Sequence, residues 1–310
     1  MRRTISILLF CALPLMSSCA TQTPLVVTEE QVSEKVTITG AVGSIEQLTI
    51  KGPDEYPSGL SPDSRWLLLN VTDTEKNKVI FKLDLQNRSK VVITSKSSNS
   101  TGGAWFPDMS SIVYSNDRSG RSVIVQSLGV SGEAGVRFVT QPALGNSLFP
   151  DVSVDGKDIA FSIFTNVDDN QIAMIDSTGT NLRVYGSGWS PQFSPDSKTL
   201  AFVQKTGEQY HICTMSSSNG SNLIQLTSGD SMNVSATWSP DGRKLAFVST
   251  RSGKHRHLFV MDSSGQNVVQ LTEGNFDVSN PKWGKDGYLY FAANAGSNWD
   301  VWRLKPKSIL

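Results

Sequence analysis

The stretch Trp238-Ser-Pro-Asp-Gly-Arg-Lys-Leu-Ala-Phe247 contains a large aromatic residue, a turn sequence and a short apolar run. Pro240 presets the backbone angle that the second position of a type I turn requires, and Gly242 suits the fourth position. The apolar run that begins at Leu245 is compatible with a β-strand and ends at turn residues. The stretch therefore predicts two strands joined by a tight turn.

The same pattern recurs along nearly the whole chain. Its turn carboxylate is found at six positions with spacings of 41 to 47 residues: Asp63, Asp108, Asp155, Asp196, Asp241 and Asp286. A period in this range indicates a repeat architecture. An apolar residue stands three positions before each carboxylate, which predicts a buried slot: Leu60, Trp105, Val152, Phe193, Trp238 and Trp283.

Each repeat has two further strand-like segments. The clearest third strand is 257–262, and the fourth is a short segment that ends in Gln-Leu-Thr at 270–272 and again at 225–227. Four short antiparallel strands form one blade of a β-propeller. The sixth repeat lacks its fourth strand, and residues 45–49 carry the matching sequence at the other end of the chain. We therefore predict an all-β, six-bladed propeller over residues 35–310, closed by an amino-terminal strand in the last blade.

The amino terminus has the features of an export signal. Arg2 and Arg3 precede an apolar stretch that is too short to span a membrane, and Ser17-Ser18-Cys19 resembles the lipobox of bacterial lipoproteins. We predict a signal peptide over 1–18, lipid attachment at Cys19 and a tether over 19–34 that spans roughly 50 Å when extended. This predicts a periplasm-facing membrane lipoprotein, in the outer membrane according to Ala20. An ordinary signal peptide with an incidental cysteine is the alternative.

Composition limits the possible classes of function. The chain has 28 basic and 28 acidic residues, 38% hydrophobic residues and no block of basic residues, which favours a folded domain and argues against nucleic-acid binding. Cys11 lies in the predicted signal and Cys19 is the predicted lipid site, so Cys213 remains without a pairing cysteine. This excludes a disulfide framework and predicts that Cys213 is a small buried hydrophobic residue. We expect a monomer.

The repeated pattern Trp-Ser-Pro-Asp-Gly, Leu-Ala-Phe, Leu-Phe-Val-Met-Asp and Gln-Leu-Thr resembles the TolB-type six-bladed propeller family over about residues 45–310. In the type member of that family the propeller follows an α/β domain and docks the peptidoglycan-associated lipoprotein. The resemblance implies an envelope protein or a peptidoglycan-associated partner. The chain departs from the type member in its lipobox and in having only about 25 residues between Cys19 and the first matching strand, so we expect the α/β domain to be absent.

Residues that could suggest catalysis have simpler interpretations. The six turn carboxylates are expected to accept hydrogen bonds from their own turns. His255 and His257 could suggest a metal pair, but His257 aligns with His211 before a third strand, which favours a hairpin. We therefore expect a non-enzymatic protein without catalytic residues, metal or cofactor. The alternative is an enzyme that acts on a carbohydrate or a lactone in the central channel.

The residues that lead into the innermost strands differ from copy to copy, as a binding face on a regular scaffold would. We predict a partner-binding rim around the channel that includes Glu55, Tyr56, Thr101, Ser147, Phe149, Asn233, Ser235 and Asn280. The alternative is that these loop residues vary without a functional reason.

Overall fold

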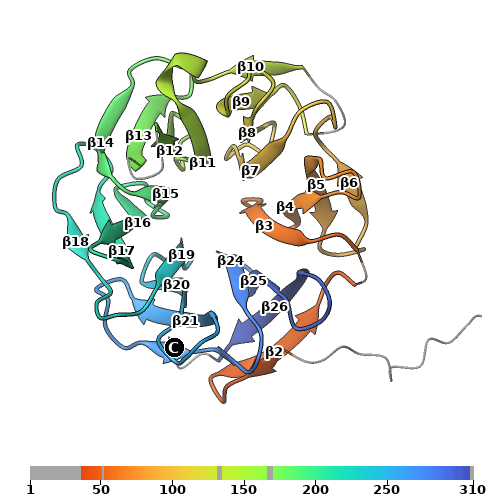
Figure 1. The fold of residues 1–310 in the computed structure, drawn as a ribbon, viewed down its shortest axis with the longest axis vertical. Coiled ribbons are helices and arrows are strands. Elements are labelled where there is room, and N and C mark those ends of the chain that lie inside the picture. Colours follow the sequence, from red (N-terminus) through yellow and green to blue (C-terminus); the bar gives the residue numbers. More distant parts are fainter. Residues whose placement is uncertain (1–35, 51, 131–134, 166–169, 308–310) are drawn as a thin grey trace, which may run out of the picture. The chain divides into compact units, whose positions relative to one another are not determined.

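The strands form six four-stranded antiparallel sheets around a central axis (Figure 1). This computed structural model describes residues 36–50, 52–130, 135–165 and 170–307. The six blades confirm the predicted propeller. The predicted signal peptide, Cys19 and the tether lie outside the described residues.

The first three blades follow one another along the chain, each running from its innermost to its outermost strand. The first contains β3 (Glu55–Leu60), β4 (Trp66–Thr72), β5 (Lys78–Asp84) and β6 (Lys90–Val92). The second contains β7 (Ser100–Trp105), β8 (Ile112–Asn116), β9 (Val123–Ser127) and β10 (Val136–Phe138). A 3-10 helix, η2 (Pro142–Leu144), precedes the third blade, which contains β11 (Asn146–Val152), β12 (Asp158–Phe164), β13 (Asn170–Asp176) and β14 (Arg183–Ser187).

The last three blades keep the same order of strands, except that the sixth takes its outer strand from the beginning of the ring. The fourth contains β15 (Trp189–Phe193), β16 (Thr199–Thr206), β17 (Gln209–Ser216) and β18 (Ile224–Gln225). The fifth contains β19 (Asn233–Trp238), β20 (Lys244–Ser249), β21 (His257–Asp262) and β22 (Val269–Gln270). The sixth contains β24 (Val278–Trp283), β25 (Leu289–Ala293), β26 (Asp300–Pro306) and β2 (Val42–Gln47).

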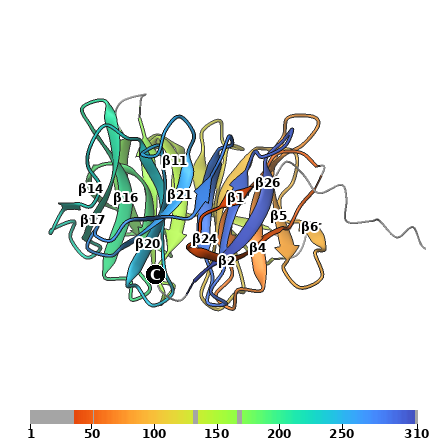
Figure 2. The same cartoon turned by 90° about the horizontal axis from the view of Figure 1, so that it is seen from below.

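Strand β2 closes the ring as the sequence predicted. It pairs antiparallel with β26, with Ile45 opposite Leu304. A second contact was not predicted from the sequence: β1 (Thr37–Ile38), labelled in Figure 2, pairs with β23 (Thr272–Glu273), which follows the outer strand of the fifth blade in the chain. The amino-terminal segment therefore binds to both of the last two blades, and it covers sheet edges that would otherwise be open.

The hydrophobic core consists of six clusters, each between two neighbouring blades. The second strands explain this arrangement, because successive side chains of a strand point to opposite faces of its sheet. Leu67 and Leu69 pack toward the sixth blade, whereas Leu68 between them packs toward the second. A strand buried on both faces requires a continuous apolar run, which is why these segments do not alternate between apolar and polar residues.

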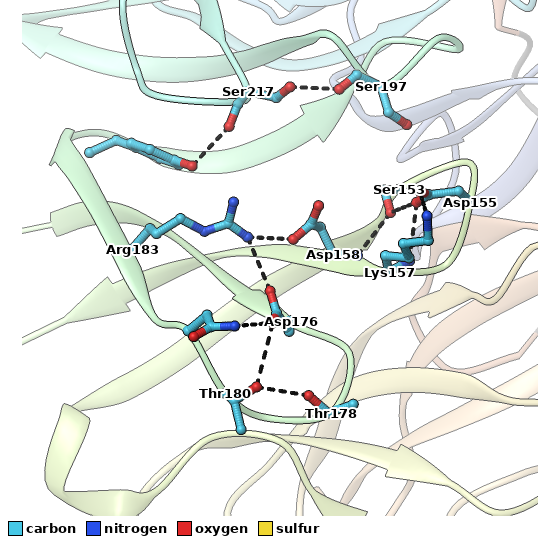
Figure 3. Close-up of polar contacts among 12 residues, drawn as sticks. Ser153, Asp155, Lys157, Asp158, Asp176, Thr178, Thr180, Arg183, Ser197 and Ser217 are labelled. Carbon is cyan, nitrogen blue, oxygen red and sulfur yellow. Dashed lines mark hydrogen bonds and ion pairs between the residues drawn. The ribbon is translucent and has the colours of Figure 1, made fainter.

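The repeated carboxylate is part of a hydrogen-bonded turn. In the third blade, Ser153 Oγ donates to Asp155 at 2.7 Å and accepts the main-chain N–H of Asp158 at 2.9 Å (Figure 3). The N–H of Lys157 also donates to Asp155, at 3.1 Å. The fourth and fifth blades repeat this arrangement around Asp196 and Asp241. The carboxylates therefore cap turns, as the sequence analysis expected.

The Gln-Leu-Thr sequence has a structural reason. The threonine hydroxyl accepts a main-chain N–H of the third strand, as from Ile80 to Thr94, from Ile212 to Thr227 and from Val301 to Thr49, at 2.9 Å in each case. These threonines are buried, so each hydroxyl satisfies a donor that water cannot reach.

The third blade lacks this threonine, and other side chains replace its contacts. Tyr185 occupies the position, and its hydroxyl donates to the carbonyl of Ser217 in the fourth blade at 2.8 Å. Arg183 on β14 binds Asp158 on β12 and, at 3.4 Å, Asp176 on β13 (Figure 3). A single guanidinium thus ties three strands of this blade together.

Cys213 is completely buried, as predicted, and burial raises the pKa of its thiol to about 11. Among the described residues, no helix has the length and apolar character needed to cross a membrane.

Candidate binding channel

The innermost strands surround a channel that contains two cavities. We call the end at which these strands begin the rim side, and the end at which they finish in Pro-Asp turns the turn side. The turn-side cavity has a volume of about 450 Å³, and the rim-side cavity has a volume of about 230 Å³. Gln192 and Lys282 line both, so they lie at the boundary between the two cavities.

Aromatic and aliphatic side chains form the wall of the turn-side cavity. They are the residues three positions before each repeat carboxylate: Leu60, Trp105, Val152, Phe193, Trp238 and Trp283. The prediction that this slot is buried holds for Trp105, but the other five are only half-buried. Each side chain packs toward the preceding blade while one edge remains open to the channel. The slot therefore serves both the core and the cavity.

A β-bulge interrupts each innermost strand where it passes the rim-side cavity. In five blades the residue six positions before the repeat carboxylate has positive φ, between 52° and 70°: Gly102, Phe149, Ser190, Ser235 and Asn280. The first blade has Pro57 there, whose ring excludes positive φ, and its bulge is shorter. All five of these residues line the rim-side cavity. The bulges turn these positions toward the mouth of the channel.

Four polar side chains occupy equivalent positions inside the channel, four residues before their repeat carboxylates. They are Asp151 of the third blade, Gln192 of the fourth, Thr237 of the fifth and Lys282 of the sixth. Lys282 Nζ donates to Gln192 Oε1 at 3.3 Å, a contact between blades that are not neighbours. The first two blades have Gly59 and Ala104 at this position, and a Cβ at Gly59 would clash with the carbonyl oxygen of Gly103, so the close approach of the second blade requires glycine there.

Both charged side chains of this layer are half-buried. Burial raises the pKa of Asp151, and the positive charge of Lys282 opposes that shift. Burial lowers the pKa of Lys282, and the negative charge of Asp151 opposes it. Asp151 Oδ2 accepts the main-chain N–H of Phe193 at 2.8 Å. This layer was not predicted from the sequence, although four of the six repeats have a polar residue directly before the apolar slot.

Three of the residues predicted for the rim do not reach its surface. Glu55, Ser147 and Asn233 all lie eight positions before a repeat carboxylate, and all are at most 2% exposed. Glu55 binds Lys90 at 2.6 Å, and Asn233 accepts hydrogen bonds from Ser249 and Arg251. These side chains support the structure beneath the rim. The predicted rim is corrected for these three residues.

The other predicted rim residues are accessible. Phe149, Ser235 and Asn280 line the rim-side cavity, and the side chain of Phe149 is 43% exposed. Thr101 and Tyr56 are half-buried and lie next to the bulges. The accessible residues among those predicted therefore lie six or seven positions before a repeat carboxylate.

Tyr56 belongs to a cluster that the sequence analysis did not find. Its ring lies 5.3 Å from the ring of Trp299, which belongs to the loop between β25 and β26. The guanidinium of Arg256 lies 5.6 Å from the ring of Trp299 and forms an ion pair with Asp277. Burial, and after it the charge of Asp54, raises the pKa of Tyr56 to about 12. We call Tyr56, Trp299 and Arg256 the rim cluster. Three different blades contribute its members.

The TolB β-propeller domain family matches residues 137–308, which is more than half of the chain and includes the third to fifth blades and three strands of the sixth. The chain belongs to the TolB β-propeller family.

Solved structures with the same architecture include proteins of different activities. A protein assigned as TolB from Agrobacterium tumefaciens is 21% identical, with a TM-score of 0.65 over 84% of this chain and 97% of its own. TolB from Acinetobacter baumannii is 20% identical, with a TM-score of 0.60 over 87% of this chain and 65% of its own. A gluconolactonase from Xanthomonas campestris is 15% identical, with a TM-score of 0.66 over 87% of this chain and 93% of its own. At these identities the likeness shows the fold alone.

The acidic residues of this TolB-family channel differ from those of a two-carboxylate glycosidase. Among the described residues that line the two cavities, Asp151 is the one with a carboxylate. The described part of the chain also contains no group of three or more histidine, cysteine, aspartate or glutamate side chains placed to hold a metal. His257 is buried against Phe276, with 5.5 Å between the ring centroids.

Proposed function

We propose that this TolB-family protein is a non-enzymatic lipoprotein of the bacterial cell envelope that binds a partner at the rim side of its propeller. The partner is another envelope protein or a peptidoglycan-associated protein. The predicted lipid on Cys19 attaches the protein to the membrane, with the propeller facing the periplasm and the outer membrane as the expected site. No cofactor is required for this role.

The rim cluster is the observation that carries the proposal. Tyrosine, tryptophan and arginine are the residue types most enriched at the energetic centres of protein interfaces. Here all three stand together at the rim, half-buried, so the protein already orders them before a partner arrives. Preordered side chains lose less conformational entropy on binding, which favours affinity.

The channel mouth continues this surface. Asn280 Nδ2 donates to the carbonyl of Pro57 at 3.3 Å, which connects the bulge of the sixth blade to the residue after Tyr56. Phe149 projects at the same mouth and lies 6.1 Å from Phe164, ring to ring. A partner segment that enters the mouth would therefore contact aromatic rings on the third blade and on the side of the rim cluster.

Affinity capture from detergent-solubilised membranes tests the proposal. Trp299→Ala, Tyr56→Ala and Phe149→Ala are each expected to weaken capture of the partner that the wild type retains, by about 2 kcal/mol or some 30-fold in Kd. Arg243→Ala is the matched control, because that side chain is 85% exposed and lies in a turn on the opposite face. Full capture by folded rim variants would contradict the assigned face.

The alternative enzyme is tested on the same purified protein. The gluconolactonase among the similar folds suggests lactones as test substrates. Oligosaccharides are tested as the second class of substrate. Turnover that is lost in Asp151→Asn would establish an enzyme of the channel and would overturn the non-enzymatic proposal.

A further inference from the structure

A cation and an anion face the turn-side cavity from different blades. Lys282 enters from β24 and Asp151 from β11. These two described side chains form no direct ion pair with each other. The ammonium has one protein acceptor, Gln192 Oε1, and the carboxylate uses Oδ2 for the N–H of Phe193. Ammonium protons of Lys282 remain available for a ligand acceptor, and the carboxylate of Asp151, which the main-chain N–H of Val152 also approaches, has lone pairs for a ligand donor.

This arrangement is costly without a ligand. A charge that leaves bulk water loses hydration, and the loss is offset only by a partner of good geometry. The directions of the two pKa shifts agree with this view, because burial disfavours the charged form of each group. A molecule that carries both complementary charges could compensate both groups at once.

We propose that the turn-side cavity binds an α-amino acid, whose carboxylate contacts Lys282 and whose ammonium contacts Asp151. An α-amino acid carries its two charges on one carbon, which suits two groups of opposite charge that face one cavity without touching. The small side chain of Ala104 lines the same cavity. The inference does not depend on the rim as the site of a protein partner.

The wall of the cavity indicates the kind of side chain. Trp105, Trp238 and Trp283 line the space on the turn side of the charged layer. An apolar or aromatic ligand side chain would pack against these indole rings. The volume of about 450 Å³ lies within the range of cavities that enclose small molecules. The preferred ligand is therefore a free amino acid with an apolar or aromatic side chain.

Calorimetry with blocked ligands tests the assignment. The L and D enantiomers of the common amino acids are first screened with the purified propeller by thermal shift. The best ligand is then titrated in parallel with its N-acetyl and its carboxamide derivatives. Each block removes one charge and is expected to weaken binding about tenfold or more, the equivalent of about 1.4 kcal/mol. Asp151→Asn should lose the discrimination against the N-acetyl form, and Lys282→Met should lose the discrimination against the amide.

If each variant loses discrimination against a different blocked ligand, Asp151 and Lys282 contact the ligand and do not only stabilise the fold. Both variants keep the shape of the native side chain, and their unfolding midpoints show whether they fold. Lys157→Met is the control, because this lysine is 79% exposed on a turn and should leave both binding and discrimination unchanged. Three outcomes would overturn the assignment: no binding at millimolar concentration across the panel, equal affinity for free and blocked ligands, or discrimination that survives in both channel variants.

Discussion

Thr272 Oγ1 accepts the main-chain N–H of Leu258 at 2.9 Å, one residue beyond the last paired position of β21 and β22. Both residues are completely buried, so no water replaces this hydroxyl. The carbonyl of Leu258 also accepts the main-chain N–H of Leu271 at 2.8 Å, so the hydroxyl adds a side-chain hydrogen bond next to this main-chain bond. The same contact in other blades explains why Gln-Leu-Thr recurs in the sequence.

Replacing Thr272 with valine is expected to destabilise the protein by about 1–3 kcal/mol, because the shape is kept while a buried N–H loses its acceptor. Denaturant unfolding of the purified propeller measures the change. Thr272→Ser is the matched control, since it keeps the hydroxyl and should retain most of the stability. Equal losses in the two variants would show that the methyl group matters and the hydrogen bond does not.

Removing the amino-terminal strands that close the ring is expected to reduce the stability more than the Thr272 substitution. Deleting residues 36–50 removes β1 and β2, and with them Val36, Val42 and Leu48 from two interblade clusters. The loss of this packing and the exposure of β26 as a sheet edge can exceed the typical stability of a domain, about 5–15 kcal/mol. Thermal unfolding checks this expectation. An unchanged midpoint would mean that the ring holds together without its amino-terminal strand.

The turn carboxylates predict a loss of stability in acid. Hydrogen bonds from Ser153, Ser194 and Ser239 and from turn N–H groups hold the pKa values of Asp155, Asp196 and Asp241 below their usual 3.8. A group whose folded pKa is lowered contributes stability above its unfolded pKa and loses it as the pH falls. The contribution should therefore disappear as the pH falls through about 4 and below.

Denaturant titrations between neutral pH and pH 3 measure this dependence. The triple variant Asp155→Asn, Asp196→Asn, Asp241→Asn should have a flatter pH profile than the wild type, because its turns no longer take up protons. Identical slopes for the two proteins would assign the acid sensitivity to other carboxylates.

Lipid attachment predicts a difference in labelling. The short apolar segment before Ser17-Ser18-Cys19 is the reason to expect a fatty acid on Cys19. Cells given a labelled fatty acid should label the wild type and leave Cys19→Ala unlabelled. Equal labelling, or wild-type protein found entirely in the soluble fraction, would contradict the lipoprotein assignment.

Local chemistry and repetition allowed the fold to be predicted. The Pro-Asp turn depends on neighbouring residues, and six copies with one missing strand required closure by residues near the amino terminus. Each repeat encodes the same four strands, so the pattern could be read without knowing the distances between blades. Arg251 shows the limit of this approach: it lies in the loop between β20 and β21, yet it packs over Phe247 and Phe259 at 4.9 and 5.3 Å.

The site depended on tertiary structure in two respects. A bulge in each innermost strand breaks the alternation of side chains, so Phe149 reaches the channel mouth while Ser147 is buried. Lys282 meets Gln192, 90 residues away, because blades that are not neighbours face each other across the channel. The sequence by itself determined the blades and their order, since those follow from local turns and repeated strands. Only the closed ring decided which side chains converge, because that depends on the bulges and on contacts across the axis.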